Sequence, residues 1–336
     1  MKSKVKIFLG LILYVSCLND VAVNRPHREL ALKRISPLKK SPIIVPLAEI
    51  VAPETADACP EGMANIENLF CIDKYEASIV DKNTGKEASP HYIPSQEGAQ
   101  NADWQYDFFE KKEMLPVKIQ QLVKDGQPVS MPARGAEQFL NFEPAAVSVA
   151  NKIPASYVTK NIAEQACRNA EKRLCLRKEW YTACAGPHES APYLNSDGDE
   201  VFPEAYPYGL SYEYGKCNLG FQEGIWPPDL LGRKNNAEML DPRIGALLGK
   251  EGLPMKRETG AFHGCANSYD VYDLVGNVHE IVADTHIANN FPKERVIFVG
   301  SHYARSAAQS CAEATKDHWP PYTDYSIGFR CCKDVE

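Results

Sequence analysis

The chain has 336 residues, of which 44% are hydrophobic and 24% are charged, and its net charge is −7. This composition excludes intrinsic disorder and a collagen-like fibre, and the single long apolar run, at the N-terminus, excludes a protein with several membrane spans. The negative charge argues against a nucleic acid as the partner.

Residues 1–17 have the features of an export signal. Three lysines precede an apolar stretch, residues 7–15, which is too short to cross a membrane as a helix. Cys17 directly follows Ser16, and a cysteine at this place resembles the acylated cysteine of a bacterial lipoprotein. The sequence predicts an exported protein of the bacterial cell envelope, periplasmic or surface-facing, anchored to a membrane through Cys17. Plain signal cleavage is the alternative.

Residues 18–52 are predicted to be a flexible basic tether, because they contain six Lys or Arg, four Pro and no aromatic residue to bury. Residues 1–52 together carry nine Lys or Arg and three Asp or Glu, so the rest of the chain holds a net charge of −13. This acidic remainder favours cation binding over binding to phosphate backbones.

Ten cysteines follow Cys17. An even number behind an export signal predicts up to five disulfides, formed in an oxidising compartment. Cys59 and Cys71 are near enough in sequence for a local bridge. A zinc site is the weaker alternative, because the chain has no Cys-x-x-Cys pair.

Regular periodicity is sparse along the remaining chain. The spacing of Ala163, Ala166 and Cys167 predicts a helix over about 160–170, and a second helix begins or ends within 179–183. Elsewhere Pro, Gly, Asn and Tyr recur every few residues, which is typical of short strands joined by long ordered loops. Residues 222–258 have no pattern and are interpreted as a surface insertion.

Four blocks of sequence carry a family resemblance. They are CIDKYEAS (71–78), ACRNAEKRLCLRKEWYTACAG (166–186), YDLVGNVHEIVAD (272–284) and DYSIGFRCC (324–332). In this order they resemble the formylglycine-generating enzyme family, also called the sulfatase-modifying-factor domain. The resemblance implies one domain over 53–336, of the α+β class, with a C-type-lectin-like fold, little regular secondary structure and many disulfides.

The resemblance also implies particular cysteine pairs. A cysteine before the KRL segment pairs with one in the GFRC ending, here Cys167–Cys331, and the cysteine after the EW pair joins one upstream, here Cys184–Cys311. The other cysteines are then assigned as Cys217–Cys265 and Cys175–Cys332. Arg173 and Arg330 are interpreted as buried partners of carboxylates.

Calcium is the cofactor that the resemblance implies. Calcium prefers six to eight oxygen ligands from carboxylates and carbonyls in a flexible loop. The ligands implied at the first site are Asp273, Gly276, Val278 and Glu280. At a second site they include Asn218 and Leu219. From spacing alone, a tight turn with two solvated acids is the alternative.

The family's oxidases bind copper through two cysteines in a C-terminal loop, and thiolates suit that metal. In the corresponding loop, residues 299–311, Ala304 and Gln309 occupy the cysteine positions, whereas Cys311 matches a structural cysteine. The sequence therefore argues against copper and against formylglycine generation.

Three histidines are the remaining catalytic candidates: His279, His302 and His318. His279 stands where the family has Trp, and His302 replaces an aromatic residue. Histidine suits iron, copper and zinc, so iron stays open as the cofactor of an oxidase. A hydrogen-bonded structural histidine is the alternative.

The function predicted first is a lipid-anchored binding module for a glycan or protein of the envelope. The second is a metal-dependent oxidase of a peptide or small molecule that uses histidine and carboxylate ligands. The third is a structural envelope protein without a ligand.

Overall fold

The computed structural model describes residues 59–95, 132–135, 141–188, 191–196, 200–219, 239–246, 255–287, 294–305 and 309–335. All of them belong to the compact unit Glu54–Glu336. The predicted signal, Cys17 and the tether lie outside the described residues. No helix in these ranges is long and apolar enough to cross a membrane.

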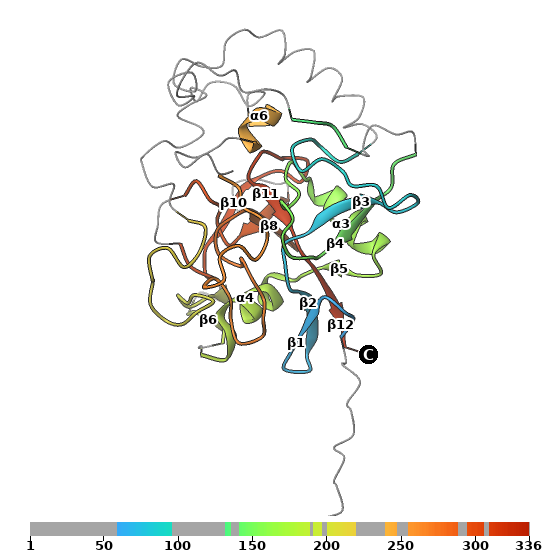
Figure 1. Cartoon of the computed structure of the whole chain (residues 1–336). Helices are drawn as coiled ribbons and strands as arrows, with labels where there is room; N and C mark the ends of the chain where they lie inside the picture. Colours follow the sequence, from blue (N-terminus) through green and yellow to red (C-terminus); the bar gives the residue numbers. More distant parts are fainter. Residues whose placement is uncertain are drawn as a thin grey trace, which may run out of the picture. The chain divides into compact units, whose positions relative to one another are not determined.

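The first sheet joins the two ends of the domain. Its strands are β1 (Met63–Ile66), β2 (Phe70–Asp73), β12 (Cys331–Asp334) and β5 (Arg173–Leu174), in that order and all antiparallel. The C-terminal strand β12 therefore lies between the beginning of the domain and its middle (Figure 1).

The second sheet lies at the centre of the core. Its order is β10 (Ala314–His318), β9 (Arg295–Val299), β8 (His279–His286) and β11 (Ile327–Phe329), with β11 parallel to β8. Successive side chains of a strand point to opposite faces. Accordingly, Ile281 and Phe298 pack into one apolar cluster, whereas Val282 and Ile297 pack into another. Both faces of β9 are buried, and Val296–Val299 are accordingly all apolar, whereas β10 is only partly buried and mostly polar.

Two helices cover the sheets. Helix α3 (Lys160–Asn169) begins at Thr159, whose side chain accepts a hydrogen bond from the Ile162 amide. Helix α4 (Arg177–Ala185) begins where the Glu179 carboxylate accepts a hydrogen bond from the Leu176 amide at 2.8 Å. The helix predicted over about 160–170 is confirmed, and the segment 179–183 lies inside α4.

The other elements are short. They comprise β3 (Ser78–Asp81) paired with β4 (Pro144–Val147), β6 (Tyr193–Leu194) paired with β7 (Glu200–Val201), a 3₁₀ turn η2 (Gly186–His188) and α6 (Pro242–Gly245). Long connections join them, as the recurrence of Pro, Gly and Tyr indicated.

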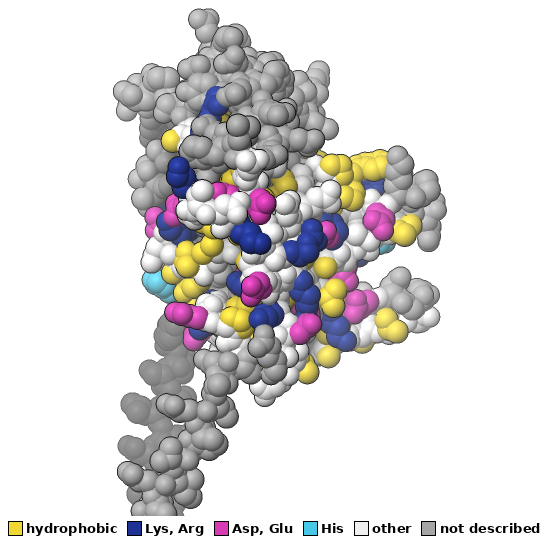
Figure 2. All heavy atoms as spheres, turned by 90° about the vertical axis from the view of Figure 1, so that its right-hand side faces the viewer, with side chains coloured by type: hydrophobic (Ala, Val, Ile, Leu, Met, Phe, Trp, Pro, Cys, Tyr) yellow, Lys and Arg dark blue, Asp and Glu magenta, His cyan; other side chains and the backbone are white. Residues whose placement is uncertain are grey.

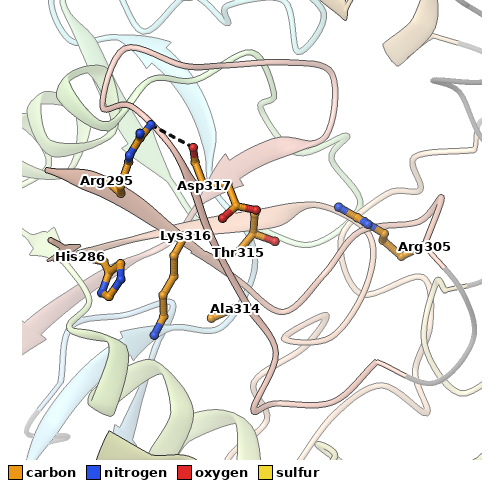
Figure 3. A pocket seen from close by; sticks show the side chains of 7 residues that line it. All are labelled: His286, Arg295, Arg305, Ala314, Thr315, Lys316 and Asp317. Carbon is orange, nitrogen blue, oxygen red and sulfur yellow. Dashed lines mark hydrogen bonds between the residues drawn. The ribbon is translucent and has the colours of Figure 1, made fainter. Parts of the chain in front are cut away.

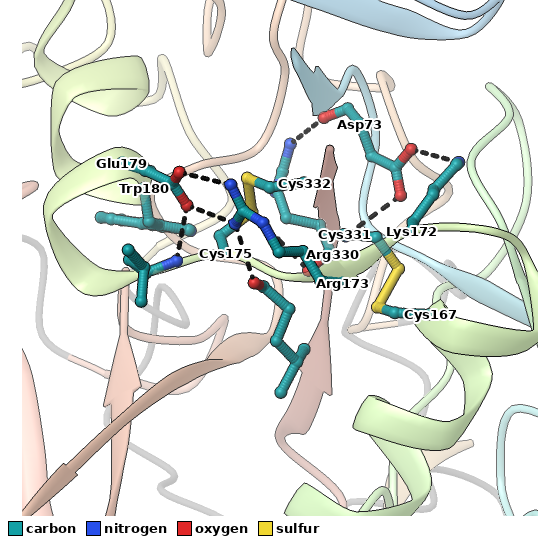
Figure 4. Close-up of a disulfide and its surroundings, with 12 residues drawn as sticks. Asp73, Cys167, Lys172, Arg173, Cys175, Glu179, Trp180, Arg330, Cys331 and Cys332 are labelled. Carbon is teal, nitrogen blue, oxygen red and sulfur yellow. Dashed lines mark hydrogen bonds and ion pairs between the residues drawn. A yellow bond between two sulfur atoms is a disulfide. The ribbon is translucent and has the colours of Figure 1, made fainter. Parts of the chain in front are cut away.

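The described residues contain five disulfides, in the pairing given above: Cys59–Cys71, Cys167–Cys331, Cys175–Cys332, Cys184–Cys311 and Cys217–Cys265. Two of them start from neighbouring residues of β12 and lead to α3 and to the residue after β5 (Figure 4). The Cys167–Cys331 bridge closes a separation of 164 residues. In the chain-entropy model a loop of that length contributes about 5 kcal/mol to stability.

The interpretation of residues 222–258 as a surface insertion is wrong for the part that the structure describes. Ile244 in α6 and Met255 are buried, and they pack against Tyr157, Tyr303 and Tyr325. The apolar residues of this segment do not recur at helical or strand spacing, so they left no periodic signal. Residues 220–238 and 247–254 lie outside the described residues.

Candidate functional site

Two of the three candidate histidines lie together in the core of the domain. His279 begins β8 and His302 follows β9, and their ring centroids are 4.9 Å apart. His279 Nδ1 faces the Val299 carbonyl at 3.4 Å, and His302 Nδ1 accepts the Ala304 amide hydrogen at 3.4 Å. We call His279 and His302 the histidine pair.

Burial keeps the histidine pair neutral. It lowers the pKa of His279 to about 3, and the nearby charge of Arg305 lowers the pKa in the same direction. The pKa of His302 is well below its usual range, because the ring is buried beside His279 and near Arg305. Neutral imidazoles offer nitrogen lone pairs to a proton or to a metal ion.

The third histidine lies on the other side of Phe298. The Phe298 ring centroid is 6.2 Å from that of His279 and 5.8 Å from that of His318. His318 instead stacks on Tyr322, with centroids 3.7 Å apart. The structure therefore brings together two of the three candidates and separates the third by an apolar ring.

Ser301 and Tyr303 flank His302 in the sequence, and both side chains carry a buried hydroxyl group. Among the described residues, the side-chain oxygens of Ser301, Tyr303 and Thr323 are buried and have no hydrogen-bond partner. The rings of Tyr303 and Tyr325 contact His302 edge-on, at centroid distances of 5.7 and 6.0 Å. Polar atoms that are buried without partners are uncommon and point to a small polar molecule that would satisfy them. Sequence reasoning missed these hydroxyls, because single Ser, Tyr and Thr residues carry no motif.

The positions of the absent cysteine pair lie beside this cluster. Ala304 is partly buried and packs against the apolar cluster of Tyr303 and Tyr325, and Gln309 is partly buried. Residues 306–308 lie outside the described residues. Since an alanine methyl and an amide replace two thiols, these positions cannot hold copper by thiolates.

A pocket of about 780 Å³ lies at the end of the second sheet. Its lining residues are His286, Arg295, Arg305, Ala314, Thr315, Lys316 and Asp317 (Figure 3). Four of these carry basic side chains and one is acidic, and we call this site the basic pocket. Sequence reasoning missed it, because these residues are dispersed over 32 positions and meet only through strand register.

Elsewhere the surface carries mixed charge. On the face shown in Figure 2, Lys and Arg side chains are interspersed with Asp and Glu. A continuous basic stripe of the kind that follows a nucleic-acid backbone is not seen on this face.

The residues implied for calcium lie next to one another. The Asn277 amide donates to the Asn218 carbonyl at 3.0 Å, and a Cβ on Gly276 would meet that carbonyl at 2.5 Å. The segment around Asn218 and Leu219 therefore packs against the turn at 276–278. Gly276 is required there, because any side chain would collide with backbone.

Glu280 is held by a buried arginine. Arg330 Nε and Nη2 donate to the two Glu280 oxygens, each at 2.7 Å, and Trp180 Nε1 donates to Oε2 at 2.8 Å. Arg330 also donates to the carbonyls of Asp73 and Tyr272. A calcium ion on Glu280 would have to share this carboxylate with Arg330.

Buried negative charge nevertheless surrounds this turn. Burial and the neighbouring carboxylates raise the pKa of Glu76 well above its usual range, and burial raises the pKa of Asp273 to about 6. Such an excess of carboxylate suits a cation. Within the described ranges, however, no three His, Cys, Asp or Glu side chains are placed to hold one metal ion. Calcium stays a prediction.

Arg173 is also paired with a carboxylate, but its side chain is only partly buried, which corrects the expectation of a buried partner. Its Nη1 and Nη2 donate to the two Glu179 oxygens, each at 2.7 Å (Figure 4). This bidentate pair joins β5 to the first turn of α4. Together with the Glu280–Arg330 pair, it places both arginines in structural roles.

A buried lysine close to the turn at 276–278 was missed by sequence reasoning. Lys256 Nζ donates to Ser156 Oγ at 2.6 Å and to the Pro90 carbonyl at 2.9 Å. Burial lowers the Lys256 pKa to about 7, against the opposing charge of Glu76. His91 lies nearby, and burial together with the charge of Lys256 lowers the His91 pKa to about 3. Lys256 lies inside the unpatterned segment 222–258, so the sequence offered no signal for it.

The family is established by a match to most of the chain. The sulfatase-modifying factor enzyme 1-like domain matches residues 70–335, so the chain belongs to the sulfatase-modifying-factor family. This membership confirms the predicted α+β, C-type-lectin-like fold. No curated protein matches the chain.

Several solved structures are similar to the chain at low identity. PvdO from Pseudomonas aeruginosa is 17% identical, with 79% of this chain and 80% of that chain covered and a TM-score of 0.35. The P3c variant of the Major Tropism Determinant is 11% identical, with 82% and 53% covered and a TM-score of 0.36. CarF is 15% identical, with 75% and 87% covered and a TM-score of 0.26. The chain thus spans about half the length of the Major Tropism Determinant, and TM-scores this low add no argument about function.

Proposed function

We propose that this protein is a lipid-anchored binding module of the bacterial cell envelope that recognises a glycan or a protein and does not generate formylglycine. The observation that carries the proposal is the residue pair Ala304 and Gln309, where two thiolates would be needed. In place of a reactive loop, the domain has a basic pocket that opens to solvent beside an enclosed pair of histidines.

The absence of formylglycine generation is tested directly. The purified domain is incubated with copper, oxygen, a reductant and a peptide that carries a sulfatase-type cysteine motif. We expect the peptide mass to stay unchanged and no aldehyde to react with a hydroxylamine probe. Aldehyde formation that requires the folded domain would overturn this part of the proposal.

Binding is tested with the envelope itself. The domain, immobilised through its C-terminus, is exposed to solubilised envelope glycans and to envelope proteins, with a heat-denatured sample as control. We expect one class of molecule to be retained reproducibly and released by excess free domain. No retention of either class would favour a structural envelope protein without a ligand.

Anchoring is tested by changing Cys17. The C17S variant should move from the membrane fraction to the soluble fraction, because a sulfur-linked lipid can no longer form. If C17S stays in the membrane fraction, Cys17 does not attach the protein to the membrane. The binding module would then stand without the lipid anchor at Cys17.

A metal-dependent oxidase is the second candidate function, and the histidine pair favours it. Two neutral imidazoles with centroids 4.9 Å apart could share a metal ion such as iron. Elemental analysis of the domain, purified without chelator, tests this candidate. Stoichiometric iron or copper that is lost in both H279Q and H302Q would place the oxidase first.

A further inference from the structure

Four of the 16 tyrosines of the chain lie in one short loop, residues 206–216, which we call the tyrosine loop. These four are Tyr206, Tyr208, Tyr212 and Tyr214. The Tyr206 ring is buried, and it contacts the rings of Tyr208 and Tyr212 at centroid distances of 5.6 and 5.9 Å. The outer tyrosines of the loop therefore rest on a buried aromatic base.

The backbone of the tyrosine loop is held in place before any ligand arrives. Tyr206 and Gly209 exchange both backbone hydrogen bonds across a tight turn, at 2.8 and 3.1 Å. The Tyr208 hydroxyl accepts the Glu213 amide hydrogen at 3.3 Å, which joins the first half of the loop to the second. The disulfide at Cys217 anchors the residue that follows the loop. A preformed loop loses little conformational freedom when it binds a ligand.

The outer side chains of the tyrosine loop are exposed. Leu210 is 63% exposed and Tyr214 is 66% exposed, while Tyr212 is partly exposed. Among the described residues, the hydroxyls of Tyr212 and Tyr214 have no hydrogen-bond partner. A tyrosine combines an apolar ring with a polar tip, so an exposed and rigidly held one suits a ligand that has both kinds of surface.

The tyrosine loop carries no net charge, although the domain around it is acidic. Its two charged side chains, Glu213 and Lys216, have opposite signs, and Lys216 Nζ lies 3.4 Å from Glu213 Oε2. The same ammonium lies 5.9 Å from the centre of the Tyr208 ring. A surface that has no excess of either charge gives an ionic ligand no advantage, so the loop favours a neutral one.

The length of the loop decides between a protein and a glycan as the neutral ligand. A stable protein interface takes about 20–30 residues from each side, whereas this loop has 11. A sugar ring is small enough to cover one tyrosine. It has a flat apolar face bordered by hydroxyl groups, and these match an exposed phenol ring and its hydroxyl.

We propose that the tyrosine loop is the binding site for a neutral glycan. The Tyr214 ring stacks on the face of one sugar, Leu210 contacts a neighbouring sugar, and the hydroxyls of Tyr212 and Tyr214 form hydrogen bonds with sugar hydroxyls. The proposal rests on the proposed function of a binding module, and it names the ligand class and the site.

The test is calorimetric titration of the domain with chitotriose and with maltotriose, two neutral oligosaccharides. We expect at least one of them to bind the wild type, with a Kd that is unchanged between about 50 and 500 mM salt. The double variant L210A/Y214A should raise that Kd at least about tenfold, because it removes the exposed contacts and leaves the buried base intact. Y214F keeps the ring and should raise the Kd less than about threefold.

The matched control is L176A. It removes another exposed leucine, which lines a separate pocket with residues of α3 and β12. The Kd of L176A should equal that of the wild type. The Tm of each variant, measured alongside, should show that it is folded at the temperature of the titration.

Several results would overturn the proposal. A loss of affinity in L176A equal to that in L210A/Y214A would mean that binding is non-specific apolar contact. A Kd for Y214F as high as that for L210A/Y214A would mean that the ring is not the contact. Binding that weakens with salt would mean that charge selects the ligand. No binding of either oligosaccharide at millimolar concentration would also overturn it.

The envelope experiment separates this proposal from the proposed function. If the wild type and L210A/Y214A retain the same envelope molecule equally well, the tyrosine loop is not the site, and the binding module stands. If the variant loses a retained protein instead of a glycan, the loop binds protein and the glycan proposal is wrong. If neither retains any molecule, the binding module itself is wrong.

Discussion

Replacing Lys256 by methionine should abolish a rise in stability that the wild type shows between pH 7 and pH 9. The amine of Lys256 is buried, and its only described contacts are with Ser156 Oγ and the Pro90 carbonyl. Glu76 is the carboxylate whose charge acts on it, and His91 is a neighbouring base. Methionine keeps the length of the side chain and removes the titrating group.

The sign of the effect follows from the two pKa values. In the folded chain the Lys256 pKa is lowered to about 7, whereas the ordinary value is 10.5. Between these values the unfolded chain holds one more proton than the folded chain, so stability rises with pH. From pH 7 to pH 9 the rise amounts to about 2 kcal/mol for one group.

The measurement is urea unfolding with the disulfides intact, at pH 7, 8 and 9, followed by tryptophan fluorescence. The free energy of unfolding of the wild type should rise by about 2 kcal/mol relative to K256M over this range. K82M, which changes an exposed lysine, should follow the wild type. Parallel pH profiles for the wild type and K256M would refute the argument, because they would mean that Lys256 titrates alike in both states.

Three further outcomes are expected. E280Q should lose about 3–5 kcal/mol of stability, because it removes the carboxylate that accepts two hydrogen bonds from the buried Arg330 guanidinium, and a loss below about 1 kcal/mol in urea unfolding would contradict the buried ion pair. Replacing both cysteines of the Cys167–Cys331 bridge by serine should lower Tm more than the same change at the Cys59–Cys71 bridge, because the two bridges close separations of 164 and 12 residues. Equal losses of Tm would contradict the dependence on loop length. Calcium added to the chelator-treated domain should raise its Tm, since a cation would relieve the crowded carboxylates near Arg330, and an unchanged Tm would remove the calcium prediction.

The features that could be predicted from the sequence are those that depend on contiguous residues. Four short blocks in a fixed order indicated the family, and with it the fold and two of the cysteine pairs, Cys167–Cys331 and Cys184–Cys311. The helix at α3 was visible because its small residues recur at helical spacing. Arg173 and Arg330 lie inside such blocks, so their pairing with carboxylates was also expected.

The features that could not be predicted depend on contacts between distant segments. The basic pocket exists because His286 and Arg295 share a register position and because β10 contains a bulge, and neither leaves a mark in the local sequence. The amine of Lys256 is held by Pro90 and Ser156, which are far from it in the chain. His318 lies on β10, with β9 between it and the strand of His279, and this strand order is likewise not visible in the local sequence.

The place of β12 has a consequence for the order in which this domain can fold. This strand follows every other described element in the sequence, yet it lies between β2 and β5 and supplies the partners of Cys167 and Cys175. A chain in which β12 has not yet paired therefore carries an interrupted sheet and two thiols, eight residues apart, whose partners are more than 150 residues away. Until β12 takes its place, these thiols can react with each other and with other cysteines. The yield of correctly paired protein should thus depend on catalysts that reshuffle disulfides, and deletion of β12 should leave a domain whose first sheet cannot close.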